Sequence, residues 1–268
     1  MKQQKEILSF FNLEGHPFSK EIKTEDLMEL PTMEKAGGEL QLLLETRGIG
    51  LLTGPSGCGK SSLIRKAVAV LNPGLYQSFY LCHTSVATGE FYQTLSASLG
   101  LPAHGRRNSL FRQIKDYILG LNDQKRIHPV VFIDEAHALS TETLKDLRML
   151  TNFDYDSKNA CTLLLCGHSE LRQRLKLNIF NSLANNITYS IRIDPLPAEE
   201  TFSYIESRIS KTGGQPGVFT RNAMKLIHDS SGGILRTIAS IAWQALIKAA
   251  QLKSTQIEKE HVQMVIER

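Results

Sequence analysis

The segment that most constrains the fold of this chain is a glycine-rich loop placed between an apolar run and a helical run. The apolar run covers residues 48–53, and residues 62–68 have the pattern of a helix. The loop follows the pattern G-x-x-x-x-G-K-[ST] and consists of Gly54, Pro55, Ser56, Gly57, Cys58, Gly59, Lys60 and Ser61. Its glycines let several backbone N–H groups converge on phosphate oxygens, and the start of the helix adds its positive dipole end. A strand, this loop and a helix in succession predict a nucleotide-binding site.

Two side chains of the loop have defined roles in such a site. Lys60 can reach the β- and γ-phosphates, and the Ser61 hydroxyl can ligate Mg²⁺. We therefore predict that the loop residues and the adjacent Ser62 bind ATP, with Mg²⁺ as the accompanying ion.

A second apolar run, residues 130–133, ends in the acidic pair Asp134 and Glu135. Such a run is typical of a central parallel strand that is buried on both faces. Because ligands of open α/β sheets bind at the carboxyl ends of the strands, we expect Asp134 beside the phosphates, holding Mg²⁺ directly or through water. Glu135 is the predicted general base, which orients and deprotonates the attacking water. His137 completes the letters D-E-A-H of a helicase motif, but the sequence shows no second motor domain, so we interpret it as a helix-start residue near the site.

The composition is ordinary for a globular protein, with 268 residues of which 41% are hydrophobic and 22% charged. This length suits one nucleotide-binding domain and a small appendage. The net charge of +4 mildly favours an anionic partner such as nucleic acid. The four cysteines form no C-x-x-C pair, no run approaches a membrane-spanning length, and the N-terminus shows no secretion signal. We therefore expect a cytoplasmic protein with reduced thiols and no membrane anchor.

Strand and helix patterns alternate through the first two thirds of the chain. The expected strands are residues 48–53, 76–82, 130–135, 162–166 and 189–193. Helical periodicity separates them, which indicates an α/β fold with a five-stranded parallel sheet and helices on both faces. Beyond the proline-rich residues 194–197 only helical periodicity follows. We expect three parts: a lead-in that contacts the nucleotide-binding domain (1–30), the α/β nucleotide-binding domain (31–195) and a C-terminal helical lid domain (196–268).

Four segments resemble the AAA+ ATPases of the ExeA-like group, and the resemblance spans most of the chain. They are residues 10–18 (FFNLEGHPF), 132–139 (FIDEAHAL), 147–153 (LRMLTNF) and 166–171 (CGHSEL). The resemblance implies an AAA+ P-loop NTPase fold. Short members of this group and their relatives MuB, TnsC and IstB are target-selecting ATPases of transposons. Longer members carry a membrane segment and a periplasmic part and serve type II secretion, and this sequence shows neither.

The resemblance implies two further residues of the ATP site. Gly232-Gly233-Ile234-Leu235-Arg236 looks like the lid motif called sensor 2, whose arginine touches the γ-phosphate. A guanidinium suits this role because its fork binds phosphate oxygens. His168 lies in the sensor 1 region, where an imidazole can hydrogen-bond the lytic water or the γ-phosphate, and Ser169 is an equal alternative.

AAA+ rings usually complete each ATP site with an arginine from the neighbouring subunit. The family has an arginine near residues 185–186, where this chain has Asn185 and Asn186. The substitutes for this arginine are Arg172, Arg174 and Arg192, each of which is equally compatible with a solvated surface charge.

A basic loop at residues 104–109 precedes a helix that carries Lys115. In assemblies like those of MuB and TnsC, this part of the domain faces duplex DNA. Arginine side chains, together with the hydroxyl and amide donors of neighbouring residues, can bind the phosphates of the DNA backbone. Such contacts do not distinguish one base sequence from another. We predict sequence-neutral duplex contacts from Arg106, Arg107, Ser109 and Lys115, the alternative being a plain solvated loop.

These features together favour an ATP hydrolase that binds duplex DNA and regulates transposition through target selection and recruitment of a partner transposase. ATP would bind between subunits and promote a ring or helical filament of identical chains, and hydrolysis would disassemble it. The alternatives are a cytosolic ATPase of a type II secretion or envelope-assembly system and a replication-type loader.

Overall fold

The computed structural model describes residues 2–22, 24, 27, 30–82, 84–154 and 157–267. Two compact units are distinguished along the chain. The sheet unit comprises Lys35–Gly54 and Leu63–Ile193. The lid unit comprises Met1–Glu34, Pro55–Ser62 and Asp194–Arg268, so the glycine-rich loop groups with the C-terminal helices.

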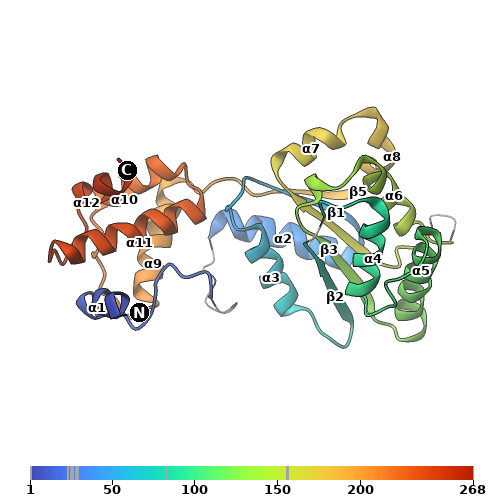
Figure 1. The fold of residues 1–268 in the computed structure, drawn as a ribbon, viewed down its shortest axis with the longest axis horizontal. Helices are drawn as coiled ribbons and strands as arrows, with labels where there is room; N and C mark the ends of the chain where they lie inside the picture. Colours follow the sequence, from blue (N-terminus) through green and yellow to red (C-terminus); the bar gives the residue numbers. More distant parts are fainter. Residues whose placement is uncertain are drawn as a thin grey trace. The chain divides into compact units, whose positions relative to one another are not determined.

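A five-stranded sheet is the centre of the sheet unit (Figure 1). Its strands are β1 (Gly48–Thr53), β2 (Tyr76–Leu81), β3 (His128–Ile133), β4 (Thr162–Gly167) and β5 (Ile187–Arg192). The spatial order is β2-β3-β4-β1-β5, and each neighbouring pair is parallel. The three inner strands are buried at every residue, whereas the edge strands β2 and β5 mix buried and exposed positions. The predicted parallel α/β sheet is confirmed.

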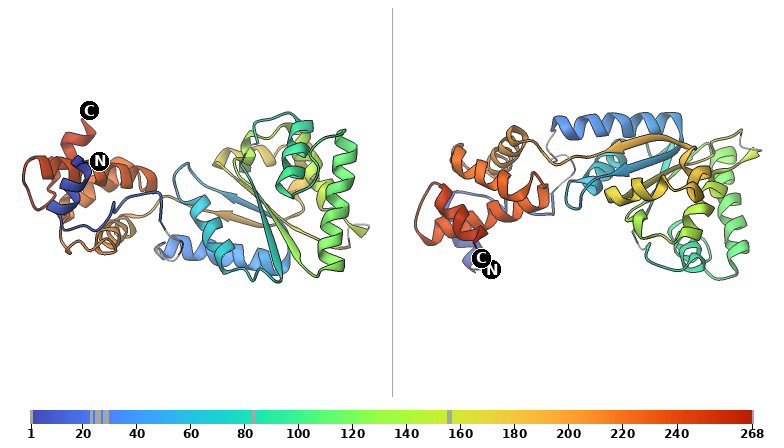
Figure 2. Two further views of the ribbon diagram at one scale, coloured as in Figure 1. Left: turned by 60° about the horizontal axis from the view of Figure 1, so that its bottom comes forward. Right: turned by 90° about the horizontal axis from the view of Figure 1, so that it is seen from above.

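Helices cover both faces of this sheet (Figures 1 and 2). On one face lies α2 (Pro31–Thr46), which buries Leu40, Leu43 and Leu44. A Cβ on Gly50 of β1 would lie 2.2 Å from Leu43 Cδ2, so only glycine lets α2 approach the strand this closely. The helices of the opposite face are α4 (Thr88–Ser98), α5 (Arg107–Gln124) and α6 (Thr141–Thr151).

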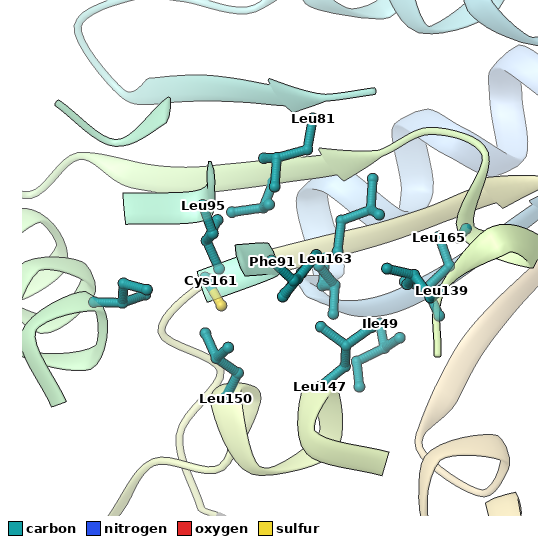
Figure 3. Packing of buried hydrophobic residues seen from close by; sticks show 14 of the residues in the cluster. Ile49, Leu81, Phe91, Leu95, Leu139, Leu147, Leu150, Cys161, Leu163 and Leu165 are labelled. Atoms are coloured by element: carbon teal, nitrogen blue, oxygen red, sulfur yellow. The ribbon is translucent and has the colours of Figure 1, made fainter. Parts of the chain in front are cut away.

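The main hydrophobic core lies between the sheet and the helices α4, α5 and α6. Figure 3 shows Leu147 and Leu150 of α6 beside Leu163 of β4 and Cys161, which precedes that strand. Alternate residues of the inner strands enter this core, because successive side chains of a strand point to opposite faces. Burial on this face fixes the register of the strands and so determines where each strand ends.

The lid unit is built from helices. They are α1 (Lys2–Phe10), α9 (Ala198–Ser210), α10 (Arg221–Ser231), α11 (Leu235–Gln251) and α12 (Lys259–Ile266). Their apolar faces share one core, which includes Ile205, Ile238 and Leu246. At the start of α10 the Thr220 hydroxyl accepts a hydrogen bond from the Ala223 N–H, the usual role of an N-cap threonine.

The N-terminal lead-in packs within the lid unit. The His16 ring stacks on Trp243 of α11 with centroids 3.9 Å apart, and Arg208 of α9 donates to the Pro17 carbonyl. The sequence predicts that residues 1–30 contact the nucleotide-binding domain, whereas the described part of this segment joins the lid core because its aromatic residues complete that core. Residues 1, 23, 25, 26, 28 and 29 of the lead-in lie outside the described residues.

Within the described ranges, no helix has both the length and the apolar character that crossing a membrane requires.

Candidate nucleotide-binding site

The glycine-rich loop leaves β1 at Thr53 and enters α3 (Lys60–Val70). Gly57 and Gly59 have φ angles of 82° and 98°, which side chains other than glycine rarely adopt. The Lys60 side chain curls back over the loop, and its Nζ donates to the Pro55 carbonyl at 2.9 Å. Cys58 is the loop residue whose side chain is buried. Burial raises the pKa of its thiol, and we interpret Cys58 as a packing residue.

The sensor 2 segment contacts this loop inside the lid unit. The Arg236 N–H donates to the Gly57 carbonyl at 3.1 Å. A Cβ on Gly57 would lie 2.8 Å from Arg236 Cβ, and one on Gly59 would lie 3.1 Å from Leu235 Cδ1. The backbone of Arg236 is thus held against the loop while the residue as a whole is exposed.

Two consecutive glycines form the turn between α10 and the segment that carries Arg236. Gly232 and Gly233 have φ angles of 59° and 75°, and Gly232 ends α10 in the left-handed conformation. The Leu196 N–H donates to the Gly233 carbonyl at 2.9 Å, and a Cβ on Gly233 would lie 2.2 Å from the Leu196 carbonyl oxygen. The turn therefore requires glycine at position 233.

Asp134 follows the last residue of β3 in the sheet unit and is 5% exposed. Its Oδ2 accepts a hydrogen bond from the Tyr80 hydroxyl of β2, and its Oδ1 accepts one from the Glu135 N–H at 2.9 Å. Burial and the bond to Asp134 raise the pKa of Tyr80, which keeps the phenol protonated as the donor. The Asp134 carboxylate is therefore oriented by two fixed donors.

Glu135 combines a fixed backbone with an open side chain. Its φ and ψ of 52° and 33° are left-handed, and its carbonyl accepts a hydrogen bond from the Thr84 hydroxyl at 2.9 Å. The carboxylate is 47% exposed, with Oε2 3.3 Å from His137 Nδ1 and 3.6 Å from His168 Nε2. This carboxylate can therefore meet water, as the predicted general base must.

The strand ends bring His168 and the start of the loop to one edge of the sheet. β1 and β4 end in register, with Thr53 opposite Gly167, and the Gly54 N–H donates to the Gly167 carbonyl at 3.3 Å. His168 follows Gly167 directly and begins α7 (Ser169–Leu175). The sequence predictions for Asp134, Glu135 and His168 thus fall at the carboxyl edge from which the loop departs.

Asp134 in the sheet unit and Ser61 in the lid unit each offer oxygen atoms of the kind that Mg²⁺ binds. The Asp134 carboxylate is buried and held by hydrogen bonds from the Tyr80 hydroxyl and the Glu135 N–H, and its oxygens are ligand atoms of the type that Mg²⁺ binds. Ser61 is exposed in the first turn of α3, next to Lys60. Oxygen ligands of this kind, few in number and supplemented by phosphate oxygens and water, are the ones that Mg²⁺ prefers.

The three arginines considered for a neighbouring site differ in their surroundings. Arg172 donates to the Thr53 hydroxyl at 3.0 Å, and Arg174 donates to the His137 and Leu139 carbonyls at 3.0 and 2.7 Å. Both side chains therefore bind within the sheet unit. Arg192 is exposed at the end of β5.

The predicted DNA-binding residues also separate into two groups. Arg107 pairs with Glu142 and Asp146, and Lys115 donates to the Met149 and Asn152 carbonyls while its Nζ lies 4.6 Å from the centre of the Phe153 ring. These two cations bind α5 to α6 and the segment after it. Arg106 and Ser109 are exposed at the start of α5.

Sequence reasoning missed two residues that shape the site. Tyr80 and Thr84 hold Asp134 and Glu135, yet they lie about fifty positions earlier in the chain. The strand pairing explains Tyr80, because its register partner on β3 is Phe132, two residues before Asp134. The sequence does show a polar residue, Tyr80, near the end of a predicted strand. Placing that residue beside Asp134 requires knowing that β2 and β3 are neighbours in the sheet.

Comparison with known proteins identifies the domain type. Residues 43–175 match the family described as an AAA domain. The chain is 32% identical over 244 residues to General secretion pathway protein A of Aeromonas hydrophila. That alignment covers 90% of this chain and 44% of the relative, so this chain spans less than half the length of that protein.

Solved structures share the fold at low sequence identity. The crystal structure of Cdc6p from Pyrobaculum aerophilum matches with a TM-score of 0.72 and 19% identity, over 93% of this chain and 70% of that one. The Aeropyrum pernix ORC1 protein in complex with DNA matches with a TM-score of 0.65 and 15% identity, over 92% and 67% of the two chains. At such identities the likeness concerns the fold alone.

Proposed function

We propose that this chain, which belongs to the ExeA-like group of AAA+ ATPases, binds and hydrolyses ATP with Mg²⁺ and that the bound nucleotide controls its assembly on duplex DNA. The observation that carries the proposal is the 3.1 Å hydrogen bond from the Arg236 N–H to the Gly57 carbonyl. This bond connects the loop that would bind the phosphates directly to the backbone of the arginine that would sense them.

Each residue of the proposed site has a separate role in ATP binding or hydrolysis. Lys60 and the loop N–H groups bind the phosphates, Asp134 and Ser61 hold the metal, and Mg²⁺ when bound neutralises charge on the β- and γ-phosphates. Glu135 accepts the proton of the attacking water, and His168 holds that water or the γ-phosphate by a hydrogen bond. Arg236, whose backbone N–H is bonded to the loop, would bind the γ-phosphate through its guanidinium.

Two observations support the extension to DNA. Arg106 and Ser109 are exposed where an arginine and a hydroxyl can contact backbone phosphates. Two proteins of the same fold, Drosophila ORC and the Aeropyrum pernix ORC1 protein, were solved with DNA. We propose a cytoplasmic ring or filament of identical chains on duplex DNA, which selects target sites and recruits a transposase, with Arg172, Arg174 or Arg192 completing the neighbouring subunit's site.

A second function is favoured by the relative from Aeromonas hydrophila, whose name places it in general secretion. In that case this chain would be the ATPase part of an envelope-assembly system. Electron microscopy with duplex DNA, with and without a non-hydrolysable ATP analogue, separates the two. Filaments or rings on DNA that need the analogue support the DNA function, and an absence of ATP-dependent duplex binding supports the secretion function.

The phosphate-loop assignment is tested by Lys60→Ala. Removing the ammonium should weaken ATP binding by roughly 10- to 100-fold, because a charge-assisted hydrogen bond contributes about 1.5–3 kcal/mol. Binding of a fluorescent ATP analogue to the folded variant measures this. Lys66→Ala, in the same helix, is the matched control, and an unchanged ATP affinity in Lys60→Ala would contradict the assignment.

A further inference from the structure

Glu135, His137 and His168 bring three metal-ligating atoms together at the carboxyl edge of the sheet. The carboxylate Oε2, His137 Nδ1 and His168 Nε2 all lie within 4.8 Å of one another. All three residues belong to the sheet unit, and each is at least partly exposed to solvent. Asp134 and Ser61 offer oxygen atoms, whereas this set offers two imidazoles and one carboxylate.

The spacing of these atoms matches a transition-metal ion. Zinc binds histidine nitrogen and carboxylate oxygen at about 2.0–2.2 Å, so tetrahedral ligand atoms lie about 3.4 Å apart. Glu135 Oε2 lies 3.3 Å from His137 Nδ1 and 3.6 Å from His168 Nε2. The three ligand atoms therefore lie close enough together for one ion to reach them once a ring has turned.

The backbone of Glu135 is held in place without an ion. Glu135 is fixed by the Thr84 hydroxyl and by its own N–H bond to Asp134. The His168 N–H is directed at His137 Nδ1 at 3.5 Å, so a metal ion bound at this nitrogen would replace that weak hydrogen bond.

One rearrangement is needed. The His137 and His168 rings are stacked, with centroids 4.2 Å apart and planes 16° from parallel. An ion lies in the plane of each imidazole that binds it, and two nearly parallel planes share no such position here. One ring must therefore rotate about χ2, and the side-chain exposures of 23% and 34% leave room for this on the solvent side.

The geometry points to a zinc-class metal site formed by Glu135, His137 and His168, distinct in its ligands from the magnesium position. Imidazole nitrogen selects Zn²⁺ and its neighbours over Mg²⁺, which prefers oxygen. Coordination to a divalent cation would make the Glu135 carboxylate a much weaker base toward water, so the ion would inhibit hydrolysis. The inhibition rests on the proposed role of Glu135 as the base, whereas metal binding does not.

Calorimetric titration of the nucleotide-free chain with Zn²⁺ in excess Mg²⁺ tests the site. We expect one Zn²⁺ per chain and a loss of affinity of about 100-fold in His137→Gln, since even the outer partners of metal ligands contribute about 10–100-fold. His104→Gln, at an exposed histidine of the basic loop, is the matched control and should bind like the parent. Circular dichroism establishes that each variant is folded, and Glu135→Gln is a second variant that should lose the ion.

The exposed thiol of Cys82 is the competing ligand. Co²⁺ bound to nitrogen and oxygen alone gives no thiolate charge-transfer band, and Cys82→Ser should keep the Zn²⁺ affinity. Loss of binding in Cys82→Ser, equal binding in His137→Gln, or an absence of stoichiometric Zn²⁺ binding by the parent would each overturn the proposal.

Hydrolysis provides the separate second readout. With Mg-ATP in excess, Zn²⁺ at one equivalent should inhibit the parent and spare His137→Gln, each measured against its own rate without Zn²⁺. If the parent binds Zn²⁺ through these residues but hydrolyses no ATP under any condition, the proposed function fails and the metal site stands.

Discussion

Glu135 shows at the residue scale how this edge of the sheet is arranged for chemistry. Its left-handed backbone carries a cost of order 1–3 kcal/mol for a non-glycine residue, which the hydrogen bonds of Thr84 and Asp134 help to offset. The carboxylate is nevertheless 47% exposed. A base that abstracts a proton from water needs both a fixed position and access to that water.

Replacing Glu135 with glutamine should therefore separate binding from turnover. The amide keeps the shape but cannot take the proton of the water, so we expect ATP affinity near that of the parent and turnover lower by about 10²–10⁴-fold. Phosphate release under single-turnover conditions measures the effect. Glu170→Gln, an exposed glutamate in the first turn of α7, is the control. Turnover at the parent rate in Glu135→Gln would show that another group is the base.

His128 supplies a pH-dependent contribution to stability. It is 2% exposed, its Nε2 lies 2.9 Å from the Thr162 hydroxyl, and among the described residues its Nδ1 has no partner. Burial, followed by the charge of Arg47, lowers the pKa of His128 to about 4. The unfolded chain therefore binds more protons than the folded chain between about pH 4 and pH 6.5, so stability rises with pH across this window.

Urea denaturation at several pH values checks this prediction. Between pH 7 and pH 4.5 the parent should lose on the order of 2 kcal/mol through this histidine. His128→Gln should lack that part of the slope, whatever its stability at pH 7, and His104→Gln, at an exposed histidine, should keep it. Identical slopes in the parent and His128→Gln would mean that His128 titrates normally in the folded chain.

At the scale of elements, the connection from α10 to α11 determines the position of Arg236. Gly232 ends α10 and Gly233 continues the turn, and the Leu196 N–H binds the Gly233 carbonyl. The next residues begin α11 with the Arg236 N–H on the Gly57 carbonyl. The backbone position of Arg236, the proposed sensor arginine, thus depends on a turn of two glycines rather than on side-chain packing alone.

Gly233→Ala should disrupt this turn. Its φ of 75° and the 2.2 Å approach of a Cβ to the Leu196 carbonyl oxygen predict a loss of stability of roughly 1–3 kcal/mol. Gly120→Ala is the opposite case, because Gly120 lies inside α5 with no heavy atom within 4 Å of a Cβ, and it should stabilise by about 0.5–1 kcal/mol. Thermal denaturation compares the two, and equal effects of the two substitutions would refute the reasoning.

At the scale of the whole molecule, the proposed DNA contact depends on which cations are available to a partner. Arg107 and Lys115 are engaged with α6 and the segment that follows it, while Arg106 lies exposed at the start of α5. An exposed arginine that meets a phosphate releases counterions, and the affinity then falls with salt. Substitution at Arg106 therefore tests the interface without breaking the fold.

Arg106→Ala should lower duplex affinity equally for all sequences and reduce the log–log salt slope by about one unit. Fluorescence anisotropy across a salt series, with the ATP analogue present, measures the slope. Lys125→Ala at the other end of α5 is the matched control. Arg107→Ala should instead lower stability, because it leaves Asp146 without its ion pair. A slope unchanged by Arg106→Ala would place any bound DNA elsewhere.

Local patterns in the sequence determined the parallel sheet, the position of the phosphate loop and the acidic residues after β3. Each of these depends on neighbours in the chain: a glycine run before a helix, or an apolar run of strand length that ends in Asp134 and Glu135.

Only the tertiary structure decided which distant residues meet. Register between β2 and β3 brings Tyr80 to Asp134, packing of the lead-in brings His16 to Trp243, and ion pairing turns Arg107 toward α6. The two histidines beside Glu135 are separated by thirty-one positions and meet because the strands before them are neighbours in the sheet. Contacts of this kind depend on strand order and on burial of whole faces, which a local pattern of residues does not contain.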